Sequence, residues 1–156
     1  MTAARVVLQI FYSTFNDFLP PRQIMRTMPR VVLIVEDADF CASTLEILLG
    51  SISNLKIMTA SSAEQAWELI RNPAEPIRAI VTDLHMPGMD GFELIDRVRG
   101  DATHAALPIM VITGSTEPDV PERLRRRGVD AVFAKPYSPA VVRETLEHLI
   151  DDFKAD

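Results

Sequence analysis

Short runs of apolar residues recur along the chain after Arg30, and polar residues do not interrupt them. Runs without alternation are typical of strands that are buried on both faces of a parallel sheet. A weaker run at residues 55–59 predicts one further strand. The four continuous runs lie at residues 31–35, 79–82, 109–112 and 131–134.

Segments with apolar residues at helical spacing separate these runs. Leu45 and Leu49, for example, lie one helical turn apart and predict an amphipathic helix that faces a core. Ser62 and Gln65 predict a capping box at the start of the second helix. The remaining helices are predicted at residues 91–99, 120–127 and 138–153, and the first spans residues 39–51.

This alternation of five strands with five helices predicts an α/β fold. The expected architecture is a doubly wound, five-stranded parallel sheet of order 2-1-3-4-5, flavodoxin-like, with right-handed crossovers and helices on both faces. Residues 29–156 are predicted to form this single domain.

Residues 1–28 do not follow the alternation and are predicted to be an N-terminal extension of uncertain order. Two interpretations stay open. In the first, the segment is an added, poorly ordered stretch, or its start codon is assigned too early and Met28 is the functional start. Alternatively, residues 3–18 form an amphipathic helix whose aromatic side chains pack on this domain or on a partner.

Composition narrows the function. The net charge of −6 gives no electrostatic case for binding nucleic acid. The single cysteine, Cys41, excludes an internal disulfide and suits a reducing compartment, so a cytoplasmic protein is expected. No apolar stretch reaches the roughly 18–20 residues that a membrane-spanning helix needs.

Polar residues follow the strands directly. Glu36 and Asp37 come after the first strand, Asp83 after the third, Thr113 after the fourth and Lys135 after the last. Parallel strands bring their carboxyl ends to one edge of the sheet, where open sheets of this class bind ligands. Each residue alone has an ordinary structural explanation, as a turn, a cap or a solvated charge. Their joint placement predicts one site.

The chemistry of that set favours phosphoryl transfer. Three carboxylates at one edge repel one another, and a hard divalent cation such as Mg²⁺ would remove that conflict. Asp83 could then stay ionised and act as a nucleophile, since carboxylates form acyl-phosphate intermediates. Lys135 supplies a positive charge for the phosphoryl oxygens and Thr113 a hydroxyl donor.

Four segments in the same order resemble the motifs of a known family. The chain from about residue 29 to residue 153 is similar to the receiver domain of two-component response regulators, and to its small, single-domain chemotaxis-type members in particular. The acidic pair, the phosphoacceptor loop, the hydroxyl segment and the lysine–proline loop of that family resemble residues 35–37, 83–91, 112–114 and 134–137.

The resemblance implies a mechanism. Asp83 would accept a phosphoryl group from a sensor histidine kinase or a histidine phosphotransfer protein. Mg²⁺ would be held by Asp37, Asp83 and the backbone carbonyl of His85, with Glu36 acting through water. The signal would pass to an unknown output protein by protein–protein interaction, and the peptide bond before Pro136 would be cis.

The loop residues have expected roles of their own. Pro87, Gly88, Gly91 and Pro136 are predicted to shape the loops around Asp83 and Lys135. The side chain of His85 is expected to face solvent. His85 and Ser115 lie two residues beyond Asp83 and Thr113, where they could tune the rate of dephosphorylation.

Two features depart from the family pattern. The position three residues before Lys135, where the family commonly has an aromatic switch residue, is Val132. The neighbouring Phe133 is expected to face the other side of the sheet. The fourth helix is short and rich in arginine, which indicates either a solvated helix end or a docking patch for an acidic partner.

Two alternatives to a stand-alone phosphoacceptor switch are disfavoured by the sequence. A Mg²⁺-dependent phosphohydrolase with an aspartyl nucleophile usually needs an acid two residues after that nucleophile, where this chain has His85. It also needs a cap, and no insertion is long enough. A receiver that works without phosphorylation is disfavoured because all five site residues are present. With only three residues after Phe153, no C-terminal output domain is expected, so the chain is predicted to be a signalling module and not an enzyme.

Overall fold

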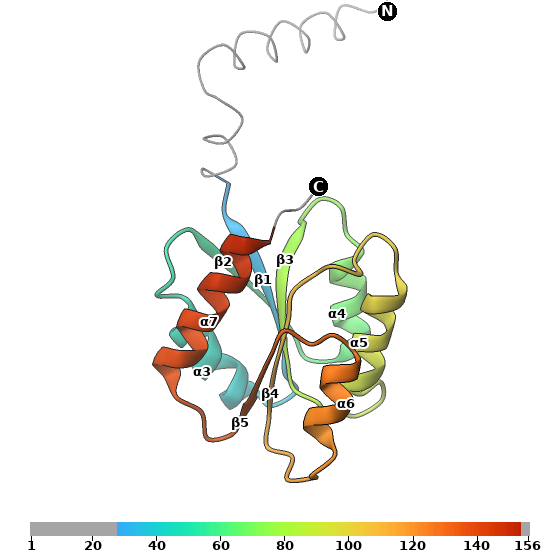
Figure 1. Cartoon of the computed structure of the whole chain (residues 1–156). Coiled ribbons are helices and arrows are strands. Elements are labelled where there is room, and N and C mark those ends of the chain that lie inside the picture. The colour runs from blue at the N-terminus through green and yellow to red at the C-terminus, as the bar shows by residue number, and fades with distance from the viewer. Residues whose placement is uncertain (1–27, 154–156) are drawn as a thin grey trace, which may run out of the picture.

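A computed structural model describes residues 28–153, so the helix considered at residues 3–18 lies outside the described residues. The chain alternates strands and helices as predicted (Figure 1). The strands are β1 (Arg30–Val35), β2 (Leu55–Ala60), β3 (Ile77–Thr82), β4 (Ile109–Thr113) and β5 (Ala131–Ala134). The helices are α3 (Asp39–Leu49), α4 (Ala63–Ile70), α5 (Gly91–Gly100), α6 (Val120–Arg126) and α7 (Pro139–Asp152).

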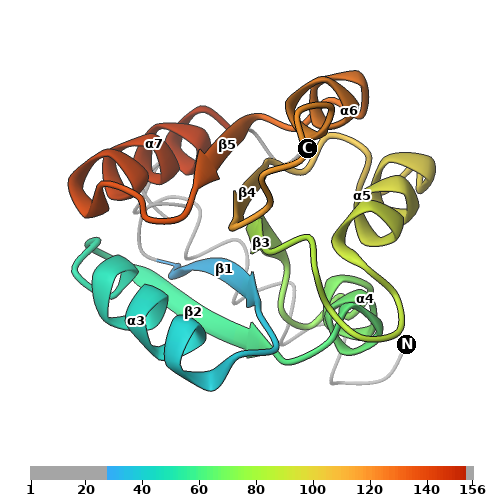
Figure 2. The same ribbon diagram turned by 90° about the horizontal axis from the view of Figure 1, so that it is seen from below.

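All neighbouring strands are parallel, and their order is β2-β1-β3-β4-β5, which confirms the predicted sheet. Helices α3 and α7 cover one face, and α4, α5 and α6 cover the other (Figure 2). Two apolar cores result, one on each side of the sheet. Such a sheet leaves its carboxyl-terminal edge open, and that edge faces the viewer in Figure 2.

The central strands are buried on both faces, as their uninterrupted apolar runs predicted. Residues 31–35 of β1 and the whole of β4 are buried. The same prediction is wrong for residues 131–134, because β5 lies at the edge of the sheet and its residues alternate between half-buried and exposed. Val132 is 40% exposed, whereas Phe133 packs with the core under α3 and α7, on the side expected for it.

The starts of helices α4 and α5 differ from the sequence prediction. The hydroxyl of Ser62 accepts a hydrogen bond from the Gln65 amide at 3.1 Å, but the Gln65 side chain accepts from Ser61 instead of closing the predicted capping box. A complete capping box forms at α5 between Asp90 and Glu93, which the sequence analysis did not single out. It anchors the helix that follows the candidate phosphoacceptor loop.

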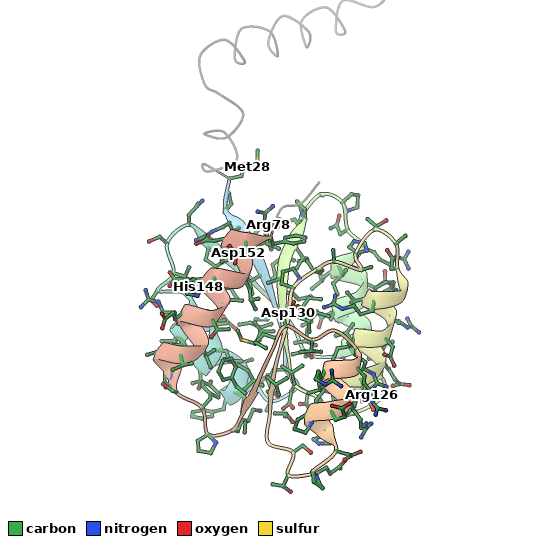
Figure 3. The ribbon with its side chains drawn as sticks, in the orientation of Figure 1. Met28, Arg78, Arg126, Asp130, His148 and Asp152 are labelled. Atoms are coloured by element: carbon green, nitrogen blue, oxygen red, sulfur yellow. The ribbon has the colours of Figure 1, made fainter. Side chains whose placement is uncertain are left out.

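The arginines of α6 are neutralised within the domain. Arg125 and Arg126 pair with Glu122 on the same helix, and Arg126 lies on the outer surface of α6 (Figure 3). Arg127 pairs with Asp96 of α5. Arg123 lies near two acidic residues of the preceding loop. These ion pairs favour a charge-balanced helix over a basic docking patch.

Helices α5 and α6 are also joined by an aromatic contact. The guanidinium carbon of Arg123 lies 4.0 Å from the centroid of the Phe92 ring, and that of Arg127 lies 5.0 Å away. Such cation–π contacts contribute about 0.5–1 kcal/mol each at exposed sites. At the opposite end of the sheet, Arg78 holds the end of α7 by donating to the Phe153 carbonyl at 3.0 Å (Figure 3).

Candidate functional site

Three of the predicted site residues meet at the carboxyl-terminal edge of the sheet. The Lys135 Nζ donates to Glu36 Oε2 at 3.0 Å and to Asp83 Oδ2 at 2.9 Å. These side chains follow β5, β1 and β3, and they are 99 and 52 residues apart in sequence. The parallel topology therefore converts distant positions into one ion-paired cluster.

Backbone amides hold the remaining oxygens of the two carboxylates. The Leu84 amide donates to Asp83 Oδ1 at 2.6 Å, and the Ala38 amide donates to Glu36 Oε1 at 3.1 Å. The Glu36 side chain is 3% exposed and that of Asp83 is 11% exposed. Asp83 is thus oriented by the protein and still accessible from solvent, as a nucleophile must be.

Burial and hydrogen bonding oppose each other in setting the pKa values of Glu36 and Lys135. Burial is the largest influence on Glu36 and raises the pKa of its carboxyl, although hydrogen bonds from Ala38 and Lys135 oppose that shift. Burial alone would lower the pKa of Lys135, but hydrogen bonds to Asp83 and Glu36 outweigh it and raise that pKa. Lys135 is therefore firmly protonated, and its positive charge lies between the two carboxylates.

Thr113 lies in the position predicted for it. It is buried at the end of β4, its carbonyl accepts from the Lys135 amide at 2.9 Å, and its hydroxyl accepts from the Ser115 amide at 3.1 Å. The Ser115 side chain is half-buried in the same loop. The hydroxyl of Thr113 keeps its own proton available for a further acceptor.

Among the residues predicted to hold the metal ion, Asp37 and His85 are exposed. Across residues 28–153, no three side chains of His, Cys, Asp or Glu are grouped closely enough to hold a metal ion by themselves. The available donors are nevertheless oxygens, which suit Mg²⁺, an ion that keeps several waters and needs few protein ligands. The residues fit such an ion chemically, and backbone carbonyl and water oxygens would complete its shell.

Glycine allows the candidate phosphoacceptor loop, between β3 and α5, to lie close to the start of α5. A Cβ at Gly91 would lie 2.3 Å from the Asp83 carbonyl oxygen and 2.8 Å from the Leu84 Cα, which are backbone atoms that cannot give way. The Gly91 amide donates to the Leu84 carbonyl at 2.9 Å. Gly88 has φ +76°, and the Lys135–Pro136 peptide bond is cis, as the resemblance implied.

One contact at the site was missed by the sequence analysis. Glu64, in the first turn of α4, accepts a hydrogen bond from the Met89 amide in the candidate phosphoacceptor loop at 2.8 Å. The two residues are 25 positions apart, and an exposed glutamate in the first turn of a helix is ordinary. No local sequence pattern therefore distinguishes Glu64 as a contact of this loop.

Sequence comparisons with known proteins identify the family of this chain. Residues 32–147 match the response regulator receiver domain family. The chain is 28% identical over 121 residues to a chemotaxis protein CheY homolog of Campylobacter jejuni, covering 76% of this chain and 91% of that protein. It is 30% identical over 118 residues to chemotaxis protein CheY1 of Helicobacter pylori, covering 74% of this chain and 93% of that protein.

Solved structures agree with the sequence comparisons. A response regulator receiver protein from Pseudomonas putida superposes with a TM-score of 0.71 at 27% identity, covering 78% of this chain and 98% of that one. Within residues 28–153, no helix is both long and apolar enough to cross a membrane. On the family match, the relatives and the shared fold, this chain belongs to the response regulator receiver domain family, the signalling modules of two-component systems.

Proposed function

We propose that this protein is a response regulator that accepts a phosphoryl group on Asp83 and signals by binding another protein. The donor is a histidine kinase or a histidine phosphotransfer protein. The observation that carries the proposal is the cluster in which Lys135 reaches both Glu36 and Asp83 at the open edge of the sheet. Residues 29–156 form the receiver domain, preceded by residues 1–28 as an extension.

The residues divide the chemistry of transfer among themselves. A carboxylate oxygen of Asp83 forms the new bond to phosphorus while the bond from phosphorus to the donor breaks, and the donor keeps that electron pair. Lys135 turns from the Asp83 carboxylate to the phosphoryl oxygens, and the Thr113 hydroxyl donates to another of them. Asp37, Asp83 and the His85 carbonyl would hold Mg²⁺, with Glu36 acting through water, and the ion would supply further charge neutralisation.

Two residues beside the site, His85 and Ser115, are proposed to tune the lifetime of the phosphoryl group. His85 is exposed two residues after Asp83, and Ser115 lies two residues after Thr113. We expect neither side chain to close off the path of an attacking water. Pro87, Gly88, Gly91 and Pro136 keep the loops in the shape that the structure describes.

The proposal is tested with a small phosphodonor. Acetyl phosphate and Mg²⁺ should add one phosphoryl group per chain, detected by intact-mass spectrometry, and chelation of the metal should prevent it. The product should be labile in base, as an acyl phosphate is. A protein that instead releases phosphate continuously from simple phosphomonoesters, with no phosphorylated chain, would be a phosphohydrolase and would refute the proposal.

The protein donor is expected to dock on α3. Phe40 and Ile47 are 83% and 81% exposed, and their spacing of seven residues puts them on one side of this helix. Phe40 lies only three residues after Asp37 in sequence, so this exposed apolar pair begins close to a predicted site residue. Exposed apolar side chains grouped in this way mark protein-binding surfaces.

We expect Phe40→Ala and Ile47→Ala each to slow transfer from the cognate donor by about tenfold, the loss of roughly 1.4 kcal/mol of contact energy. Transfer from acetyl phosphate should be unchanged, since that donor needs no protein surface. Val132→Ala, an exposed apolar position on the other side of the sheet, is the matched control. Equal slowing with both donors would mean that the substitutions disturb the site and not the docking.

A further inference from the structure

The loop between β3 and α5 carries Asp83 at one end and is fixed at both ends by its own contacts. The Leu84 amide is bonded to the Asp83 side chain, and the Gly91 amide is bonded to the Leu84 carbonyl. Asp90 is held by the capping box with Glu93. Just before Asp90, the loop is also held by a contact from a different element of the fold.

That contact comes from Glu64 of α4. Its Oε1 accepts the Met89 amide hydrogen at 2.8 Å, so a charged acceptor on one helix holds the backbone of the loop. Met86 is buried in the apolar core to which Ala63 of α4 also belongs, and Met89 is partly buried against the same core. The Glu64 carboxylate therefore bonds to a loop whose methionine side chains share an apolar core with α4.

Gly88 is matched to this arrangement. A Cβ on Gly88 would lie 2.8 Å from Glu64 Oε1, closer than unstrained atoms approach, and the φ of +76° already favours glycine. The absence of a side chain leaves room for the carboxylate to lie against the loop backbone. The hydrogen bond from the Met89 amide also lowers the pKa of Glu64, so the acceptor is ionised at neutral pH.

We propose that Glu64 is a positioning residue for phosphoryl transfer, whose carboxylate holds the Met89 amide so that the backbone from Asp83 to Gly88 keeps one conformation. That backbone includes the His85 carbonyl. A ligand group held in one conformation binds and reacts more readily than one that must be ordered first. The role rests on the proposed function of Asp83.

The contact itself is tested by amide hydrogen exchange in the full chain. In Glu64→Ala the Met89 amide should exchange about tenfold faster, because it loses a charged acceptor. In Glu64→Gln the side-chain oxygen can still accept, so exchange should stay near the wild-type rate. Glu68→Ala removes an exposed carboxylate one turn later on α4 and should leave Met89 unchanged. Unchanged Met89 exchange in Glu64→Ala would overturn the proposal.

The positioning role is tested by Mg²⁺ calorimetry and by the initial rate of phosphorylation from acetyl phosphate. Glu64→Ala should weaken Mg²⁺ binding and slow phosphorylation by about three- to tenfold, with Glu64→Gln close to wild type and Glu68→Ala unaffected. Equal slowing in all three variants would indicate a general effect of charge and overturn the role, as would wild-type values in Glu64→Ala. A wild-type protein that is never phosphorylated would instead refute the proposed function.

Discussion

Asp83→Asn is expected to abolish phosphoryl incorporation altogether. Asparagine has the shape of aspartate and can still accept the hydrogen bond that the Leu84 amide donates to Asp83 Oδ1. Its uncharged amide is not a nucleophile, so the acyl-phosphate bond cannot form. Because the fold and the loop contact are preserved, the loss would report on chemistry and not on stability.

The measurement is incorporation of label from acetyl phosphate, followed by borohydride trapping and peptide mapping. Glu36→Gln serves as the control, since Glu36 lies in the same cluster and bonds to the same lysine. It should reduce the rate while the label stays on the peptide that contains Asp83. Label recovered from the Asp83→Asn protein at another carboxylate would contradict the assignment.

Lys135→Met is expected to destabilise the metal-free protein by about 2 kcal/mol. Breaking a fully buried ion pair costs about 3–5 kcal/mol, and this lysine is partly exposed. The substitution leaves Glu36 and Asp83 crowded without a cation, and two adjacent carboxylates repel. Mg²⁺ should therefore bind the variant more tightly than wild type and restore part of the lost stability.

Urea unfolding in chelator and in Mg²⁺ measures both effects. Lys56→Met is the matched control, because Lys56 pairs with Glu75 at the surface. Surface pairs of this kind contribute about 0–1 kcal/mol. If the two lysine variants lose equal stability, or if Mg²⁺ stabilises the Lys135→Met and wild-type proteins equally, the positive charge between the carboxylates is not what holds the site.

The difference in stability between wild type and Lys135→Met depends on pH, and the pKa of Lys135 sets its direction. The pKa of Lys135 is raised in the folded chain above its usual 10.5 by the two carboxylates that it bonds. An ammonium with a raised folded pKa binds its proton more tightly in the folded state, so its stabilising contribution is complete below the unfolded pKa. The stability gap between wild type and Lys135→Met should hold through neutral pH and shrink as the pH rises above 10.5.

Edge position explains why one strand prediction was wrong. Residues 131–134 have the same apolar character as the central strands, and burial on both faces was expected for all of them. The sheet order puts β5 at an edge, where Val132 is 40% exposed. An apolar run reports that a residue can be buried, while the number of elements packed on it decides whether it is.

The sequence alone determined the order of the strands and helices, the parallel sheet and the residues at its carboxyl-terminal edge. Apolar runs and helical spacing are local properties, and parallel topology then constrains where strand ends lie. Only the tertiary structure decided that Lys135 lies between Glu36 and Asp83, and that Glu64 holds the Met89 amide. Such contacts join residues 25 to 99 positions apart, and they depend on side-chain directions and loop paths that no local pattern encodes.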